Sequence, residues 1–448
     1  MPGFASSEGG VDESARRRHR VTSASTAPGQ YSRTRRVLVM LVCAVSSSLV
    51  VRAQIDQQRA DRYFSEAAAL CERDGGRLWG VSLCGPMVFA DASTRSIATN
   101  QPAPEAPRPP VLGFVNAPID WGGTRWSAYV WSMIPADDPQ ARGRLLVHEL
   151  FHRVQPQLGL LVTGKPNDHL DTSEGRYWLQ LEWRALARAL AASGDERGDA
   201  VGDALAFRAA RRHAFVGSAE SERADEIREG LAQYTGTIVA VRSPAGANAD
   251  AIAQLTASEK TPTFVRTFAY PSGAAYGLLL DAWSPGWTRR LESTDDLGQL
   301  LTEAAGVRPA ADVKMAAGRY GGPDLLVLEQ RRASERQARI AELRRRFVEG
   351  PVLAVPRGRG AMLSTVGATP IPNEGTVFFE YRVTAEWGSL ESTGVLESAD
   401  GQTLRLPVPF QVDGGTLTGE GWKITLAPGW AARPGRRPGD FEIVRERK

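Results

Sequence analysis

The segment Val147-His148-Glu149-Leu150-Phe151-His152 places two histidines four positions apart, with a glutamate directly after the first. On an α-helix, residues four apart lie on the same face, so both imidazoles point the same way. This pattern is typical of a zinc hydrolase, in which the ion acidifies a water molecule and the glutamate takes its proton. Because the chain has only five histidines, the spacing favours a metal site over two structural histidines.

A catalytic zinc site also needs a third protein ligand and an open position for water. Glu229, in the segment Glu229-Gly230-Leu231-Ala232-Gln233-Tyr234, lies on a separate predicted helix. Glu226 lies about one turn earlier and competes for the same helix face. The other candidates for the third ligand are Glu182, His169 and Asp171.

The His-Glu-x-x-His helix, followed on a later helix by Glu-Gly-x-Ala-x-Tyr, resembles the gluzincin clan of zinc metallopeptidases, which are peptidase MA-like. The resemblance covers residues 111–290 and implies that Glu229 is the third ligand of one Zn²⁺ ion per chain. The other large branch, the metzincins, continues with a glycine and a third histidine soon after the first motif. Gln155 and Leu158 stand at those places here, so that branch is disfavoured.

Two tyrosines follow the predicted third-ligand helix. A zinc hydrolase stabilises its oxyanion with the metal and a further donor, often Tyr, His or Arg. In related peptidases such donors come after the third ligand, so the resemblance implies a catalytic role for Tyr270 or Tyr276; each also fits an aromatic core residue. Asp225 either orients a zinc histidine or is simply exposed.

Together these residues predict an exported, zinc-dependent metallopeptidase that acts on a peptide or protein substrate. Zinc is held by His148, His152 and Glu229, and Glu149 acts as general base before passing the proton to the leaving amine. One alternative is a zinc hydrolase of a non-peptide amide or ester. The other is a catalytically inactive binding protein on the same scaffold, but the sequence retains Glu149 and all three ligands.

The elements around the first motif are predicted from caps and alternation. Asp138 can cap the metal helix, Pro139 fits its first turn and Pro156 ends it. The run 124–134, with alternating side chains, predicts a strand leading into this helix. That strand is either a plain core strand or lies beside the active cleft and takes up an extended peptide by backbone pairing.

The remaining pattern predicts further strands and helices. Strands are expected at 77–84, 87–90, 96–99, 111–115 and 235–241, and helices at 57–71, 172–192, 201–215, 218–234, 272–283 and 329–348. Five prolines between Pro102 and Pro110 predict an exposed loop. The 329–348 helix is strongly basic, and a solvated linker is favoured over a site for polyanions.

The first 53 residues have the pattern of a targeting segment. Eight arginines and three acids give this stretch a positive charge, whereas the whole chain carries +3, so the remainder offers no general case for nucleic-acid binding. The apolar run 37–51 follows three arginines and has the length of a signal-peptide core. We expect a disordered basic leader with a signal peptide or anchor, export to the periplasm or cell exterior, and no membrane tether other than this segment.

Cys71 and Cys84 are the cysteines that remain beyond the leader. In an oxidising compartment they are expected to form one disulfide, and the competing interpretation is two buried thiols.

The fold class expected is α+β: a zincin-like catalytic domain with an antiparallel or mixed sheet before the metal helix, then a helical subdomain and a small C-terminal all-β domain. The boundaries expected are 1–53 for the leader, 54–323 for the metallopeptidase domain, 324–349 for a basic helical linker and 350–448 for the β domain. The β domain is expected because glycines and prolines separate short β-like stretches from residue 350 onward.

Overall fold

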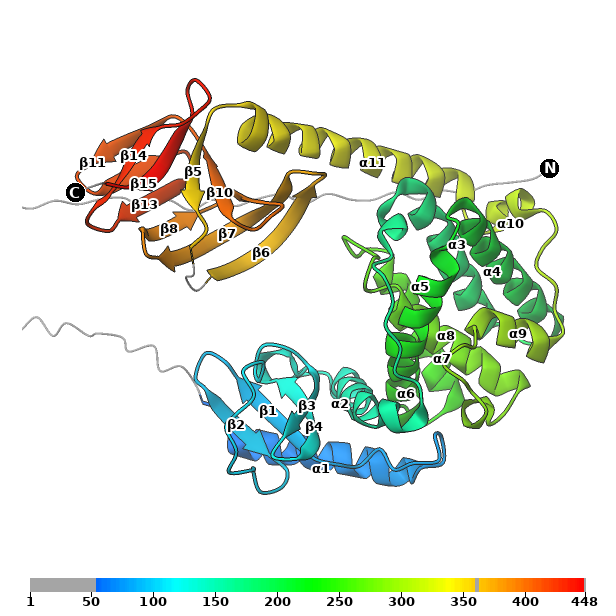
Figure 1. The fold of residues 1–448 in the computed structure, drawn as a ribbon. Coiled ribbons are helices and arrows are strands. Elements are labelled where there is room, and N and C mark those ends of the chain that lie inside the picture. The colour runs from blue at the N-terminus through cyan, green and yellow to red at the C-terminus, as the bar shows by residue number, and fades with distance from the viewer. Residues whose placement is uncertain (1–53, 359–361, 447–448) are drawn as a thin grey trace, which may run out of the picture. The chain divides into compact units, whose positions relative to one another are not determined.

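The computed structural model describes residues 54–358 and 362–446, so the predicted leader and the apolar run 37–51 lie outside the described residues. Helices and strands are mixed in the described chain, which confirms the α+β class. In the described residues no helix is both long enough and apolar enough to cross a bilayer. Residues 54–350 hold a small sheet and the helices, and the chain after residue 351 is built of strands (Figure 1).

The helices and strands before the metal motif form one layer of sheet with helices against it. The elements are α1 (Gln57–Asp74), β1 (Met87–Asp91), β2 (Ser96–Thr99), β3 (Ala117–Trp121), β4 (Thr124–Val130), the 3₁₀ turn η1 (Trp131–Met133) and α2 (Pro139–Val154). The sheet has the order β2-β1-β4-β3, with β1 and β4 parallel and the outer pairs antiparallel. β4 therefore has a neighbour on both sides, so of the two predicted alternatives the core strand is confirmed and pairing with a peptide is wrong.

The second group of elements is helical. It comprises the 3₁₀ turns η2 (Gln155–Leu158) and η3 (Asp168–Asp171), the helices α3 (Ser173–Ala191), α4 (Gly194–Ala214) and α5 (Ser218–Asp225), the π-helical turn η4 (Glu226–Gly230), and α6 (Leu231–Ala240), α7 (Pro244–Ser258), α8 (Ala269–Trp283), the 3₁₀ turn η5 (Trp287–Arg289), α9 (Leu297–Ala305) and α10 (Val313–Arg319). One buried apolar cluster runs through these helices and continues under the small sheet. Helix α2, which carries the His-Glu-x-x-His motif, belongs to it through Leu146, Val147, Leu150 and Phe151, which are almost completely buried.

The last elements are α11 (Gly322–Arg344), the π-helical turn η6 (Arg345–Glu349) and eleven strands. The strands are β5 (Val352–Pro356), β6 (Met362–Ile371), β7 (Gly375–Ala385), β8 (Gly388–Ser392), β9 (Val395–Ser398), β10 (Thr403–Pro407), β11 (Phe410–Asp413), β12 (Thr416–Gly419), β13 (Trp422–Leu426), β14 (Trp430–Pro434) and β15 (Phe441–Arg445). They form one curled sheet (Figure 1) with a buried cluster of its own.

Three predicted strands are wrong, and each fails for a local reason. Residues 77–79 form a turn and 80–84 are irregular, because the Asp74 carboxylate accepts hydrogen bonds from the backbone of Gly76 and Leu78 and thereby closes the chain on itself. Residues 111–115 also form a turn, and the strand begins later, at Ala117. The run 235–241 is helical up to Ala240, because this β-branched segment is buried between helices and tertiary packing overrides its propensity.

The disulfide joins Cys71, near the end of α1, to Cys84, in the loop before β1. Arg153, on the last turn of α2, donates to the backbone carbonyls of Leu83 and Cys84 at 3.1 and 2.8 Å. The cross-linked loop is therefore bound to the end of α2.

Candidate metal centre

Helix α2 holds the first motif through its own cap and through the sheet beneath it. The Asp138 carboxylate caps the helix by accepting from the backbone of Ala141. From β4, the buried hydroxyls of Ser127 and Tyr129 donate to the carbonyls of Glu149 and Leu146 at 3.0 and 2.7 Å. These bonds fix the rotation of α2, so that His148 and His152 face the helical group.

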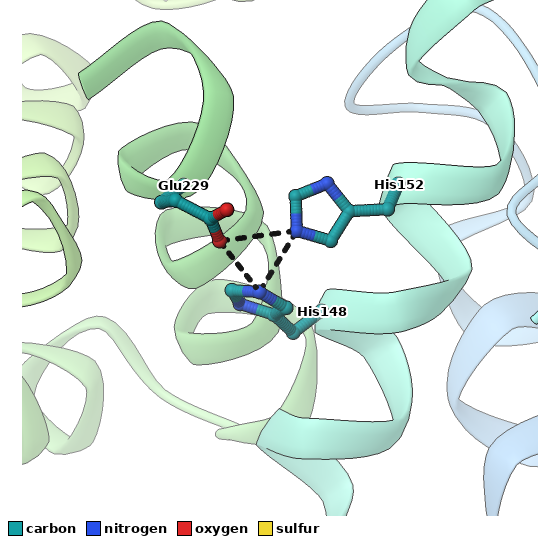
Figure 2. A group of neighbouring side chains, drawn as sticks. All are labelled: His148, His152 and Glu229. Carbon is teal, nitrogen blue, oxygen red and sulfur yellow. Dashed lines mark hydrogen bonds and ion pairs between the residues drawn. The ribbon is translucent and has the colours of Figure 1, made fainter. Parts of the chain in front are cut away.

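The third acidic residue comes from the π-helical turn η4, between α5 and α6. Glu229 Oε2 lies 3.4 Å from His148 Nε2 and 3.3 Å from His152 Nε2, and the two Nε2 atoms are 3.0 Å apart (Figure 2). Three potential ligand atoms therefore converge on one point from two helical segments. In the described residues this is the one group of histidine, cysteine or acidic side chains with the spacing of a metal site.

Close backbone contacts set the position of the turn that carries Glu229. Gly230 lies against Gly273 of α8, where an added Cβ on Gly273 would stand 2.2 Å from the Gly230 Cα. On the other side, an added Cβ on Gly236 would meet the Arg144 carbonyl oxygen of α2 at 2.6 Å. Glycines at both contacts let α6 and η4 approach α2 and α8 more closely than any side chain would allow.

Both histidines are oriented by glutamine side chains. His152 Nδ1 lies 2.9 Å from Gln155 Oε1, and His148 Nδ1 lies 3.2 Å from Gln233 Oε1. Gln233 donates through Nε2 to Gln254 at 2.6 Å, and Gln254 donates to the Asp250 carboxylate at 2.7 Å. The Asp250 carboxylate can only accept, so Gln254 donates to it through its amide nitrogen and accepts from Gln233 through its amide oxygen. The Gln233 oxygen then faces His148, so His148 Nδ1 is the donor of that hydrogen bond.

The same logic applies to His152, because the Gln155 amide donates to backbone carbonyls and its oxygen is left to accept from Nδ1. Both Nε2 atoms then carry lone pairs, and these lone pairs face each other and the Glu229 carboxylate. Such an arrangement is repulsive unless a cation or a proton lies among the three atoms. The donor set therefore fits a divalent metal ion.

Glu149 lies beside the triad and is almost completely buried. In the described part of the chain, its Oε2 has no hydrogen-bond partner. Burial raises the pKa of Glu149, although the neighbouring His148 and His152 oppose that shift. A buried carboxyl oxygen with unused bonding capacity is suited to accepting a proton from a group held at the triad.

The charges within the triad depend on one another. Burial alone would raise the pKa of Glu229, but hydrogen bonds to His148 and His152 hold it well below its usual range. Burial alone would lower the pKa of His152, but the hydrogen bond to Glu229 and the nearby Glu149 raise it above its usual value. Protons and a metal ion therefore compete for the same nitrogen atoms.

The two predicted tyrosines lie in different surroundings. The Tyr270 ring stacks on His148, with ring centres 5.4 Å apart and planes 2° from parallel. Burial, and then the charge and hydrogen bonding of Glu229, raise the pKa of Tyr270, so its hydroxyl stays protonated and can donate. Tyr276 is completely buried and donates to Glu182 at 2.7 Å instead, so the structure does not bring it to the triad.

The other third-ligand candidates have different partners. Glu182 forms ion pairs with Arg208 and Arg211, and His169 Nε2 lies 2.8 Å from Glu222. Asp171 accepts from the backbone of Phe264 at 3.0 Å. The competitor on the same segment, Glu226, points to Arg208. Of the candidates for the third ligand, Glu229 is therefore the one whose carboxylate meets the two histidines.

Asp225, predicted either to orient a zinc histidine or to be exposed, does neither. It is buried and accepts from Asn167 at 2.8 Å and from Arg228 at 2.7 Å. Gln155 and Gln233 orient the rings instead, and the sequence interpretation missed both. A spacing signal exists, because Gln155 follows His152 by three positions and Gln233 follows Glu229 by four, which places each glutamine on the helical face of a proposed ligand.

Comparisons with protein-family models, with curated proteins and with solved structures find no match to this chain. The resemblance to the gluzincin clan stays a prediction that rests on the two motifs.

Proposed function

We propose that this chain is a zinc-dependent metallopeptidase of the gluzincin type, with a zincin-like catalytic domain that runs from residue 54 into the first turns of α11. One observation carries the proposal: His148 Nε2, His152 Nε2 and Glu229 Oε2 lie within 3.0–3.4 Å of one another. Two imidazoles and one carboxylate are the ligand set of catalytic zinc in thermolysin-like hydrolases, where a fourth position is left for water.

Zinc is the ion proposed because imidazole ligands suit it, whereas magnesium and calcium prefer sites made of oxygen atoms alone. When bound, it would supply a Lewis acid and an acidified water. Glu149 Oε2 would accept the proton of that water and return it to the leaving amine. Tyr270, stacked on His148, would donate its hydroxyl to the oxyanion.

We also propose that the protein works outside the cytoplasm. This part of the proposal rests on the predicted signal or anchor in the first 53 residues. The disulfide between Cys71 and Cys84 supports it, because such bonds persist mainly in oxidising compartments.

Metal content is the first test. Purified wild-type protein, dialysed against trace zinc, is expected to retain one zinc per chain by elemental analysis, and His152→Ala to lose it. His213→Ala is the matched control, because His213 is an exposed histidine of α4. Equal zinc in wild type and His152→Ala would overturn the proposed site.

Peptide cleavage is the second test. A mixed peptide library is expected to be cut by the zinc-loaded wild type and left intact by Glu149→Gln, which keeps the shape of the side chain but removes the base. Zinc bound without peptide cleavage, but with hydrolysis of simple esters or amides that Glu149→Gln abolishes, would replace the peptidase by the non-peptide hydrolase. Zinc bound with no hydrolysis of any of these would identify an inactive binding protein.

A further inference from the structure

The ligands of the proposed metal site come from two segments, and a single side chain connects them. His152 lies on α2, whereas Glu229 lies on η4, where the backbone of Leu231 donates to the Glu226 carbonyl five residues earlier. Such π-helical turns are rare and occur often at functional sites. The turn must keep one position relative to α2 if the carboxylate is to meet the imidazoles.

Gln155 lies between these two segments and is 1% exposed. Its amide nitrogen donates to the carbonyls of Ile227 and Arg228 at 3.0 and 3.2 Å, inside η4. Its amide oxygen lies 2.9 Å from His152 Nδ1. One planar group thus contacts both the ring of the second ligand and the backbone directly before the third ligand.

The direction of these bonds follows from chemistry alone. Backbone carbonyls only accept, so the amide nitrogen of Gln155 must face η4 and its oxygen must face the histidine. The histidine then has to carry its proton on Nδ1, which leaves the Nε2 lone pair free for a metal. Any displacement of η4 therefore acts directly on the group that orients the ring.

We propose that Gln155 is a positioning residue that couples the ring of His152 to the Glu229 turn, so that both ligands are held in place before an ion binds. This inference rests on the proposed metal site and adds a determinant of its affinity. Orienting groups outside the ligands themselves typically change metal affinity by about 10–100-fold when they are removed. The effect belongs to the chain itself and is measurable without any substrate.

The test compares two buried glutamines. Gln155→Ala removes the coupling, whereas Gln180→Ala removes a glutamine of α3 that is equally buried and donates to Arg176 and Glu329 instead. Zinc dissociation constants are measured by competition with a chromogenic chelator on the full chain. We expect Gln155→Ala to bind zinc about 10–100-fold more weakly than wild type, and Gln180→Ala to stay within about threefold.

Circular dichroism and thermal melting in excess chelator show whether each variant folds without metal. Equal zinc affinity for folded Gln155→Ala and wild type would overturn the proposal. So would an equal loss in Gln155→Ala and Gln180→Ala, because it would reflect general loosening of the core. If Gln155→Ala does not fold, Gln155→Glu decides.

Gln155→Glu separates the two halves of the coupling. A glutamate still accepts from His152 Nδ1, but it offers no donor to the carbonyls of Ile227 and Arg228. Weaker zinc binding than wild type is expected, and wild-type affinity would overturn the link to η4. A wild-type chain that binds no zinc would refute the proposed function itself, whereas a zinc-binding wild type with unaffected variants would refute this inference alone.

Discussion

Tyr270 and Tyr276 show how the same side chain serves different purposes according to its neighbours. Tyr270 packs its ring on His148 and has a raised pKa, first from burial and then from Glu229. Tyr276 packs against Arg208 and donates to the buried Glu182. The first hydroxyl is next to the proposed metal centre, and the second is one partner in an ionic network of the helical core.

Removing each hydroxyl should therefore have different consequences. Tyr270→Phe keeps the stacked ring, so zinc affinity is expected to stay within a few-fold while kcat falls by about 10²–10³-fold, as for loss of one oxyanion donor. Tyr276→Phe removes one hydrogen bond to the buried Glu182 carboxylate and is expected to lower the free energy of unfolding by about 1–3 kcal/mol. Steady-state kinetics and urea unfolding measure the two effects. A kcat loss of similar size in both variants would contradict the assignment.

Proton competition at the triad predicts a pH dependence of metal binding. Zinc needs the neutral imidazole, and the pKa of His152 lies above its usual value, through Glu229 and Glu149 and against the effect of burial. Zinc affinity is therefore expected to fall as the pH drops, beginning at a higher pH than for an ordinary histidine. Zinc affinity should fall about tenfold per pH unit for each proton that the ion displaces. Chelator competition at several pH values measures it, and a flat profile through that range would contradict the prediction.

At the scale of residues, the sequence predicted the two histidines because helical spacing alone places them on one face, and it predicted Glu149 because it directly follows the first of them. Gln155 and Gln233 were missed because their role depends on the neighbouring helices. Gln155 is meaningful only when η4 brings two carbonyls to its amide, and Gln233 only when α7 supplies Gln254. Spacing within one helix carries no information on where another helix crosses it.

At the scale of elements, the contact between η4 and α8 decides where Glu229 lies. Gly230 and Gly273 meet so closely that a methyl group on Gly273 has no room. The prediction of a strand at 235–241 failed for a related reason. That segment is rich in β-branched residues, but Gly236 fits it against the Arg144 carbonyl of α2, and burial between helices keeps it helical.

Gly273→Ala is expected to push η4 away from α8. Overpacking of this kind typically lowers the free energy of unfolding by about 1–3 kcal/mol, and zinc affinity should fall with it because Glu229 moves. Gly318→Ala is the matched control: it lies in α10, where an added Cβ meets nothing within 4 Å, and it should stabilise by up to about 1 kcal/mol. Chemical unfolding and zinc titration of both variants provide the measurement. Unchanged zinc affinity in Gly273→Ala would show that the contact does not position Glu229.

At the scale of the whole molecule, α11 connects the helical group to the strands. At its start, buried Glu329 pairs with Arg176 at 2.9 Å and accepts from Gln180 at 2.7 Å, both on α3. At its end, Leu343 and Phe347 pack with residues of the C-terminal strands. The sequence prediction placed a domain boundary at 323/324 because the strongly basic helix that follows was interpreted as a solvated linker. The Glu329 pair shows that the first turns of α11 pack with α3.

Two truncations test where the catalytic part ends. A chain of residues 54–337 keeps Glu329 and omits Leu343 and Phe347, whose partners are the strands. A chain of residues 54–323 lacks Glu329 and leaves Arg176 with the longer pair to Asp171, at 3.8 Å. Breaking a buried pair typically lowers stability by about 3–5 kcal/mol. We expect 54–337 to bind zinc like the full chain, and 54–323 to unfold at much lower urea. Glu329→Ala in the full chain should reproduce most of that loss, and equal unfolding midpoints for the two truncations would place the boundary back at 323.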